Sequence, residues 1–326
     1  MKEKQKNLRK YVLFIGLLVL VIVLLELITC NSEVKAEVIT EKSNNGINYN
    51  FDTQTGMLII SGNGEIIGIH DFDNTKPLAE GITKIKKEKI KNIKIEKGIT
   101  SIRENAFFVC NNLTSIEIPD SVTSIGENAF GNCTSLTKIE IPDSVTNIGY
   151  SAFLGCTKLT TIKIPDNNVI IGNSVFSFCE SLTTIKIPSS VISIEEQAFS
   201  MCKSLTSIEI PDGVTSIGKN AFFYCKNLKN IKIPDSVTNI GEDAFKGCKN
   251  LTIICNPNSK AYEFAKKNNI KTKTNELESQ NNNNEEQNNT NNKTDKQNNL
   301  FLILGIVIVV VAIIGVTIII IISKKK

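Results

Sequence analysis

The sequence predicts a β-rich solenoid with an N-terminal hairpin cap and a C-terminal helical cap, followed by a terminal transmembrane helix. Three observations carry this prediction. Residues 90–250 form seven consecutive units of 23 residues with Phe and Cys at fixed positions. The flanking segments 37–89 and 251–272 depart from the repeat, as the end units of a repeat array must. Residues 300–322 are almost wholly apolar and long enough to cross a bilayer.

The first half of each unit predicts a short strand that ends at a proline. In the unit Leu113–Ser135, Ile116 and Ile118 alternate with polar residues, which is the period of a strand with one buried face. Proline cannot donate a hydrogen bond to a sheet, so Pro119 ends the strand. A period of about 20–29 residues with leucine and isoleucine at these spacings is typical of a leucine-rich-repeat solenoid.

The second half of the unit returns to the core. Val122 and Ile125 predict a second short strand. Ala129 and Phe130 are expected to pack inward from a short helical or 3-10 turn. Cys133 then closes the coil as a small buried hydrophobic residue.

Stacked coils place equivalent residues above one another. The phenylalanines predict an internal aromatic column of Phe107, Phe130, Phe153, Phe176, Phe199, Phe222 and Phe245. The cysteines predict a line of buried free thiols, because stacked side chains point in parallel and do not converge on a metal: Cys110, Cys133, Cys156, Cys179, Cys202, Cys225 and Cys248. One unit has Asn168 in the position of a valine, which predicts a local bulge.

Composition argues against several classes of function. The 37 basic and 33 acidic residues leave a net charge of only +4, too little for a nucleic-acid binder. His70 is the only histidine, and beside Asp71 and Asp73 it fits a surface cluster better than a metal site. The segment Gly62–Gly64 fits a turn and lacks the G-x-G-x-x-G pattern. We therefore expect no enzymatic activity, no cofactor, no metal and no small-molecule substrate.

Residues 1–36 have the layout of a secretory signal. A basic start is followed by the apolar run Tyr11–Leu25 and by small residues around Val34–Ala36. Two alternatives stay open: the segment is retained as a signal anchor, or the chain is acylated at Cys30.

The other end predicts a membrane anchor. Residues 273–299 are rich in asparagine and are expected to form a disordered linker. Residues 300–322 form the predicted transmembrane helix, and residues 323–326 a basic cytoplasmic tail. The prediction is a cell-membrane protein, single-pass after signal cleavage, with an extracellular repeat domain.

The motifs I-P-D-S-V-T-x-I-G and A-F-x-x-C recur through residues 90–250 and resemble the BspA-like leucine-rich-repeat family of secreted and surface proteins, mostly bacterial. Residues 50–64 are similar to the hairpin that often precedes such repeats, although the usual tryptophan is missing. Leu251–Lys271 resembles the closing cap of the family, with Ala261–Ala265 as a short helix. The resemblance implies a binding role at the cell surface.

The exposed face of the first strands is the candidate site for a partner. It carries Lys138, Glu140, Thr161, Lys163, Thr184, Lys186, Ser207 and Glu209. Lys163 beside Lys186 makes a small basic patch that favours an acidic partner. We expect an adhesion module for an extracellular protein or glycan, anchored to the membrane by its C-terminal helix. The alternative is a structural spacer or coat protein without a specific ligand, since these side chains also keep a sheet soluble.

Overall fold

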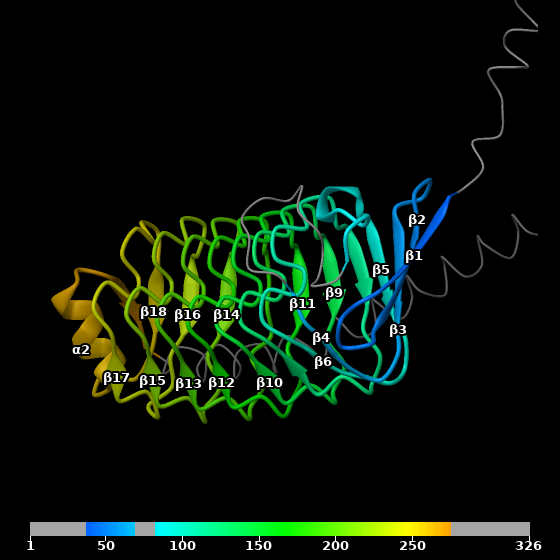
Figure 1. Cartoon of the computed structure of the whole chain (residues 1–326). Helices are drawn as coiled ribbons and strands as arrows, with labels where there is room; N and C mark the ends of the chain where they lie inside the picture. The colour runs from blue at the N-terminus through cyan, green and yellow to red at the C-terminus, as the bar shows by residue number, and fades with distance from the viewer. Residues whose placement is uncertain (1–36, 69–81, 275–326) are drawn as a thin grey trace, which may run out of the picture.

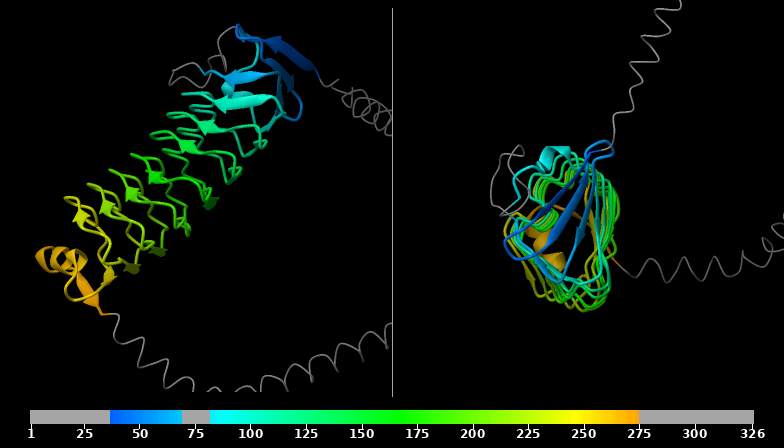
Figure 2. Two further views of the ribbon diagram at one scale, coloured as in Figure 1. Left: turned by 90° about the horizontal axis from the view of Figure 1, so that it is seen from below. Right: turned by 45° about the vertical axis from the view of Figure 1, so that its right-hand side comes forward.

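The computed structural model describes residues 37–68 and 82–274, which wind into a β-solenoid of about eight turns with repeats of about 23 residues. Figure 1 shows the coils stacked along one axis, with the N-terminal strands at one end and helix α2 at the other. In the right-hand view of Figure 2 the coils nearly superpose on one closed outline. Each coil therefore contacts the coil before it and the coil after it.

The first strand of the coils forms one side of the solenoid. Adjacent strands are parallel, and equivalent residues lie opposite each other, as Ile116 does to Ile93 and Ile162 to Ile139. In the strands of the inner repeats the outer residues are exposed and the central isoleucine is buried, as predicted. The strands are β5 (Asn92–Ile95), β7 (Ser115–Glu117), β9 (Lys138–Glu140), β11 (Thr161–Lys163), β14 (Ser207–Glu209), β16 (Asn230–Lys232) and β18 (Thr252–Ile254).

The predicted second strand is also present in each repeat. These strands are short and parallel, and in most of them the second residue is a buried isoleucine such as Ile125 or Ile217. They form a second ladder, visible below the first in Figure 1. The strands are β6 (Ile99–Ile102), β8 (Ser124–Ile125), β10 (Asn147–Ile148), β12 (Ile170–Ile171), β13 (Ser193–Ile194), β15 (Ser216–Ile217) and β17 (Asn239–Ile240).

The segment around Ala129 and Phe130 is a series of hydrogen-bonded turns and not a regular helix, and both side chains are buried, as predicted. The amide of Gly131 donates to the carbonyl of Asn128 at 2.9 Å, which closes one turn. Asn128 (φ 51°) and Asn132 (φ 58°) adopt the left-handed backbone conformation. A right-handed helix cannot pass through such residues, and their recurrence in every coil explains why the chain turns here.

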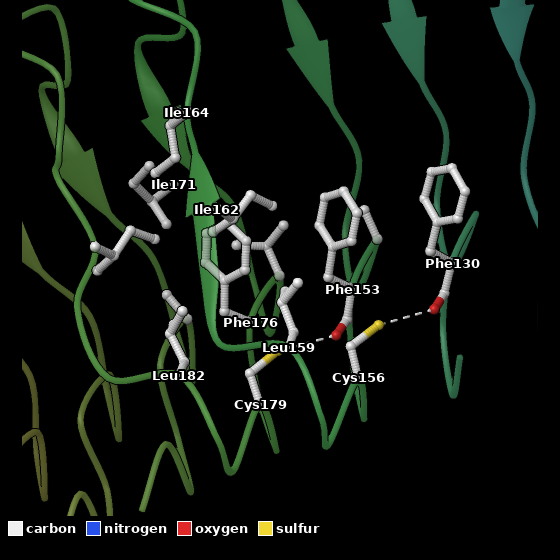
Figure 3. Close-up of a cluster of buried hydrophobic side chains, with 14 of the residues drawn as sticks. Phe130, Phe153, Cys156, Leu159, Ile162, Ile164, Ile171, Phe176, Cys179 and Leu182 are labelled. Carbon is white, nitrogen blue, oxygen red and sulfur yellow. Dashed lines mark hydrogen bonds between the residues drawn. The ribbon is translucent and has the colours of Figure 1, made fainter. Parts of the chain in front are cut away.

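Stacked phenylalanines and cysteines fill the core. Neighbouring rings of the predicted column lie 5.2–5.8 Å apart between centroids, and all seven rings are buried. Figure 3 shows Cys156 donating to the carbonyl of Phe130 and Cys179 to that of Phe153, at 3.2 and 3.3 Å. The thiols therefore satisfy buried backbone oxygens of the preceding coil as well as filling space.

The predicted N-terminal hairpin is confirmed and continues into both ladders. Strand β2 pairs with β1 and β3 in antiparallel fashion, and β3 pairs in parallel with β5. Strand β4 pairs with β6, the first strand of the second ladder. The cap thereby covers the first coil on both sides. Its strands are β1 (Val38–Lys42), β2 (Asn48–Asp52), β3 (Met57–Ser61) and β4 (Gly64–Ile66), and a short 3-10 helix, η1 (Lys87–Lys89), follows.

One carboxylate ties the hairpin to the segment that enters the solenoid. Glu41 on β1 accepts hydrogen bonds from the backbone amides of Thr83, Lys84 and Ile85, at 3.0–3.2 Å. Partial burial opposes ionisation of Glu41, but these bonds to its charged form outweigh that effect and lower its pKa.

The C-terminal cap contains the predicted helix and also extends the first ladder. Helix α2 (Lys260–Lys267) begins at Ser259, whose hydroxyl accepts a hydrogen bond from the amide of Tyr262. Strand β19 (Lys271–Lys273) pairs with β18, so the ladder runs on past the last repeat. Phe264 packs edge-on against Phe245 at 5.9 Å and covers the end of the aromatic column.

The repeat that contains Asn168 interrupts the second ladder. Strand β10 belongs to the sheet β10-β8-β6-β4 and β12 to the sheet β12-β13-β15-β17. A Cβ atom on Gly149 would lie 2.6 Å from the backbone of the preceding coil, whereas the nearest atom to a Cβ on Gly172 would be 3.7 Å away, in Tyr150. The sequence predicts a local bulge at Asn168, and the structure instead shows an interrupted second ladder with a wider spacing between the two coils at Gly172.

Among residues 37–68 and 82–274, no helix is both long enough and apolar enough to span a bilayer. The predicted signal segment 1–36, almost all of the linker 273–299, the apolar segment 300–322 and the tail 323–326 lie outside the described residues.

Candidate interaction surface

The eight predicted face residues are all exposed on the side formed by the first strands. Strands β9 and β11 carry the first four of them, and β14 carries Ser207 and Glu209. Thr184 and Lys186 lie between these strands, in a coil that joins its neighbours through a bridge from Lys186 to Lys163 and through backbone hydrogen bonds of Thr183. The strand geometry thus brings the predicted residues to one surface.

The charges on this face largely neutralise each other. Lys138 pairs with Glu140 at 2.5 Å and Lys163 with Asp143 at 2.8 Å. The hydrogen bond from Lys138 lowers the pKa of the Glu140 carboxyl, and the hydrogen bond to Asp143 raises the pKa of the Lys163 ammonium. Within the described ranges, Lys186 has no carboxylate partner. The predicted basic patch therefore has one unpaired lysine.

A shallow depression of about 550 Å³ lies on this face, over β9 and β11. Its walls combine charged side chains with the apolar edges of the strands and of Pro142. Such a depression fits a side chain of a macromolecular partner better than it encloses a small molecule. The lining residues are Ile118, Asp120, Lys138, Ile139, Glu140, Ile141, Pro142, Asp143, Thr161, Ile162 and Lys163.

The other groups that the sequence singles out do not form a chemical site in the described part. Gly62 and Gly64 have positive φ angles of 129° and 119°, and Gly64 bonds to Gly98, so this segment is a turn, as predicted. The column cysteines are buried, and burial raises the pKa of Cys110 to about 12. A thiol such as that of Cys110 is therefore a poor nucleophile at neutral pH. His70 with Asp71 and Asp73 lies outside the described residues.

Sequence reasoning did not single out the exposed apolar side chains. Tyr150, Val169, Ile170 and Ile192 are about half exposed and lie near the gap in the second ladder. Phe178, Met201 and Tyr224 are exposed or partly exposed at one position of three successive coils. Alignment of the repeats could have identified Tyr150, Val169 and Ile170, because most other repeats have a polar residue at each of these positions.

The chain has counterparts of known structure. It is 25% identical to a leucine-rich repeat protein from Eubacterium ventriosum over 68% of this chain and 73% of that one, with a TM-score of 0.43. A leucine-rich repeat protein from T. pallidum is 26% identical over 72% of this chain and 98% of that one, with a TM-score of 0.49. A leucine-rich cell surface protein from Faecalibacterium prausnitzii is 23% identical over 70% and 98% of the two chains, with a TM-score of 0.33. No curated protein matches the chain.

The family model for the BspA type leucine rich repeat region matches the chain in six copies. The matches cover residues 83–206 and 169–294, which together exceed half of the sequence. They include the strand-proline and A-F-x-x-C motifs that build the two ladders and the core. This chain belongs to the BspA-type leucine-rich-repeat family.

Proposed function

We propose that this protein is a membrane-anchored extracellular module that binds protein or glycan partners in adhesion or recognition. One observation carries the proposal: a ladder of parallel strands presents exposed side chains in register on successive coils. Solenoids use such extended surfaces to bind macromolecules. Leucine-rich-repeat proteins generally bind other proteins or glycans and are typically non-enzymatic.

Two sequence segments support the extracellular location. Residues 1–36 have the layout of a secretory signal, and residues 300–322 form an apolar stretch followed by three lysines. Lysines flanking an apolar segment favour the cytoplasmic side. The repeat domain, which lies between the two segments, is then outside the cell.

Charge reversal on the face tests the binding role. Cells that express the full chain with Lys163→Glu and Lys186→Glu are expected to attach at least about fivefold less to an array of matrix proteins and glycans, because the surface charge that meets the partner changes sign. The matched control is Lys158→Glu with Lys219→Glu, which changes the net charge equally at exposed positions off the face. Equal loss in both variants would contradict the proposal.

The mutual pairing of charges on the face favours a second candidate, a structural spacer or coat element. Lys138, Lys163 and Lys232 each lie within 4 Å of a carboxylate, as is expected of a surface that only has to remain soluble. In that case neither double variant changes attachment to any component of the array.

A further inference from the structure

One position of the coil has a left-handed backbone in every repeat. Its φ angles lie between 56° and 86°. Asparagine and glycine tolerate this conformation, whereas bulky residues are strained in it. The residues at this position are Val109, Asn132, Gly155, Phe178, Met201, Tyr224 and Gly247.

Three adjacent coils place large side chains at this strained position. We call Phe178, Met201 and Tyr224 the aromatic stripe. Phe178 is 44% exposed and Tyr224 38% exposed, so burial in the core does not compensate the strain. The ring of Tyr224 extends over the next coil, where a Cβ atom on Gly247 would lie 2.6 Å from it. Strain that folding does not require points to a function.

A column of lysines runs beside part of the stripe and one coil beyond it. Lys203 and Lys226 lie two residues after Met201 and Tyr224, and Lys249 lies two residues after Gly247, whereas Glu180 takes this place after Phe178. Lys203, Lys226 and Lys249 occupy equivalent positions in three successive coils. The ammonium of Lys226 lies 5.7 Å from the ring centroid of Tyr224, within the range of a cation–π contact. Lys203 pairs with Glu180 at 2.6 Å, whereas Lys226 and Lys249 have no ion pair with any residue that the structure describes.

The combination of residues indicates what binds here. Aromatic residues and methionine are enriched in protein–protein interfaces. Two unpaired lysines attract carboxylates. Three coils at about 4.8 Å each match a few residues of an extended chain. We propose that the aromatic stripe and its lysine column bind an acidic protein segment that also carries apolar side chains.

This surface is separate from the face considered under the proposed function. The stripe lies on the turns that follow the second strand of each coil, and Lys163 and Lys186 lie on the first-strand side. The two proposals can therefore fail independently. Charge reversal at Lys163 and Lys186 is expected to leave binding at the stripe unchanged.

Replacing the stripe with asparagine tests the proposal without endangering the fold. The triple variant Phe178→Asn, Met201→Asn, Tyr224→Asn introduces asparagine at these positions. Asn132 already occupies the equivalent position of another repeat with the same left-handed backbone. Its melting temperature is expected to equal or exceed that of the parent, because the strain is relieved. The control Tyr150→Asn removes another exposed aromatic residue, which lies away from the stripe.

The probes are labelled synthetic peptides, and the readout is fluorescence anisotropy with the purified full chain in detergent micelles. The probe peptide contains both acidic residues and Phe or Leu residues. Two control peptides replace either its apolar residues with serine or its acidic residues with lysine. The probe is expected to bind at least about tenfold more tightly than either control. The stripe variant, and separately Lys226→Glu with Lys249→Glu, should weaken that binding at least about tenfold, whereas Tyr150→Asn should not.

Three results would overturn the proposal. The first is unchanged peptide binding by the stripe variant. The second is a lower melting temperature of that variant, which would show that the side chains serve the fold. The third is binding of an acidic polysaccharide, but not of the acidic apolar peptide, at the same lysines.

Discussion

At the scale of single residues, the core depends on a phenylalanine and a cysteine that recur in each coil. The phenylalanine ring stacks on the rings of the neighbouring coils. The backbone carbonyl of the same residue accepts a hydrogen bond from the cysteine thiol of the next coil. The stacking requires an aromatic ring at that position, whereas the carbonyl is a backbone group whose partner depends on the cysteine of the next coil, because a buried carbonyl without a partner is costly. The identity of these residues therefore follows from the stacking of coils.

Removal of one ring tests this column. Phe153→Ala is expected to lower the free energy of unfolding by about 3–5 kcal/mol, because the cavity lies between two stacked rings and cannot collapse easily. Denaturant titration followed by circular dichroism measures the change. Tyr150→Ala, three residues away and 59% exposed, should stay within about 0.5 kcal/mol of the parent. Equal effects of the two substitutions would show that Phe153 is not in the core.

At the scale of elements, the coil with Asn168 shows how one substitution breaks a ladder. In most repeats a serine and a valine occupy these two positions, and the hydroxyl of Ser144 donates to the carbonyl of Val122. Here the amide of Asn168 turns inward and donates to the carbonyl of Val145 at 3.0 Å. The carbonyl keeps a partner, but a buried amide replaces the valine side chain, and the second strands of the two coils, β10 and β12, do not pair.

Restoring the common pair should close the gap. The double variant Asn167→Ser, Asn168→Val is expected to raise the free energy of unfolding by about 0.5–2 kcal/mol and to slow hydrogen exchange at the amides of Val169 and Gly172. Asn168→Val alone should be less stable than the double variant, because the Val145 carbonyl loses its donor, at a cost of about 1–3 kcal/mol. Destabilisation by the double variant would mean that the asparagine closes this coil better than the common pair does.

At the scale of the whole molecule, the solenoid is a rod with two kinds of surface. On the first-strand face most charged side chains are paired. The residues of the aromatic stripe have a strained backbone and exposed side chains, and unpaired lysines lie beside them. A rod can engage partners on both surfaces at once, provided that it is held outside the cell.

Trypsin treatment of intact cells tests this arrangement. The proposed topology predicts release of a folded fragment that starts near residue 37 and ends within residues 273–299, because that segment offers lysines in a polar stretch without predicted structure. Mass spectrometry identifies the released peptides. Protection of the repeat domain until the cells are lysed would show that it lies inside.

The sequence by itself determined the period, the two strands of each coil, the buried columns, the hairpin and the cap helix. The period, the strands and the columns follow from the pattern that recurs every 23 residues, whereas the hairpin and the cap helix were expected from the resemblance of the flanking segments to the family. Residues such as Ile116, Phe130 and Cys133 occupy the same environment in every coil, so seven copies reinforce one interpretation.

Only the tertiary structure decided the features that depend on how one coil meets the next. The turns around Phe130 depend on the left-handed backbone at Asn128 and Asn132, which asparagine permits but does not require, since serine, glutamine and phenylalanine take the same conformation in other coils. The gap at Asn168 and the strain at Phe178 likewise arise between coils. A side chain's strain and exposure depend on the coil stacked beside it, which the sequence of a single repeat does not specify.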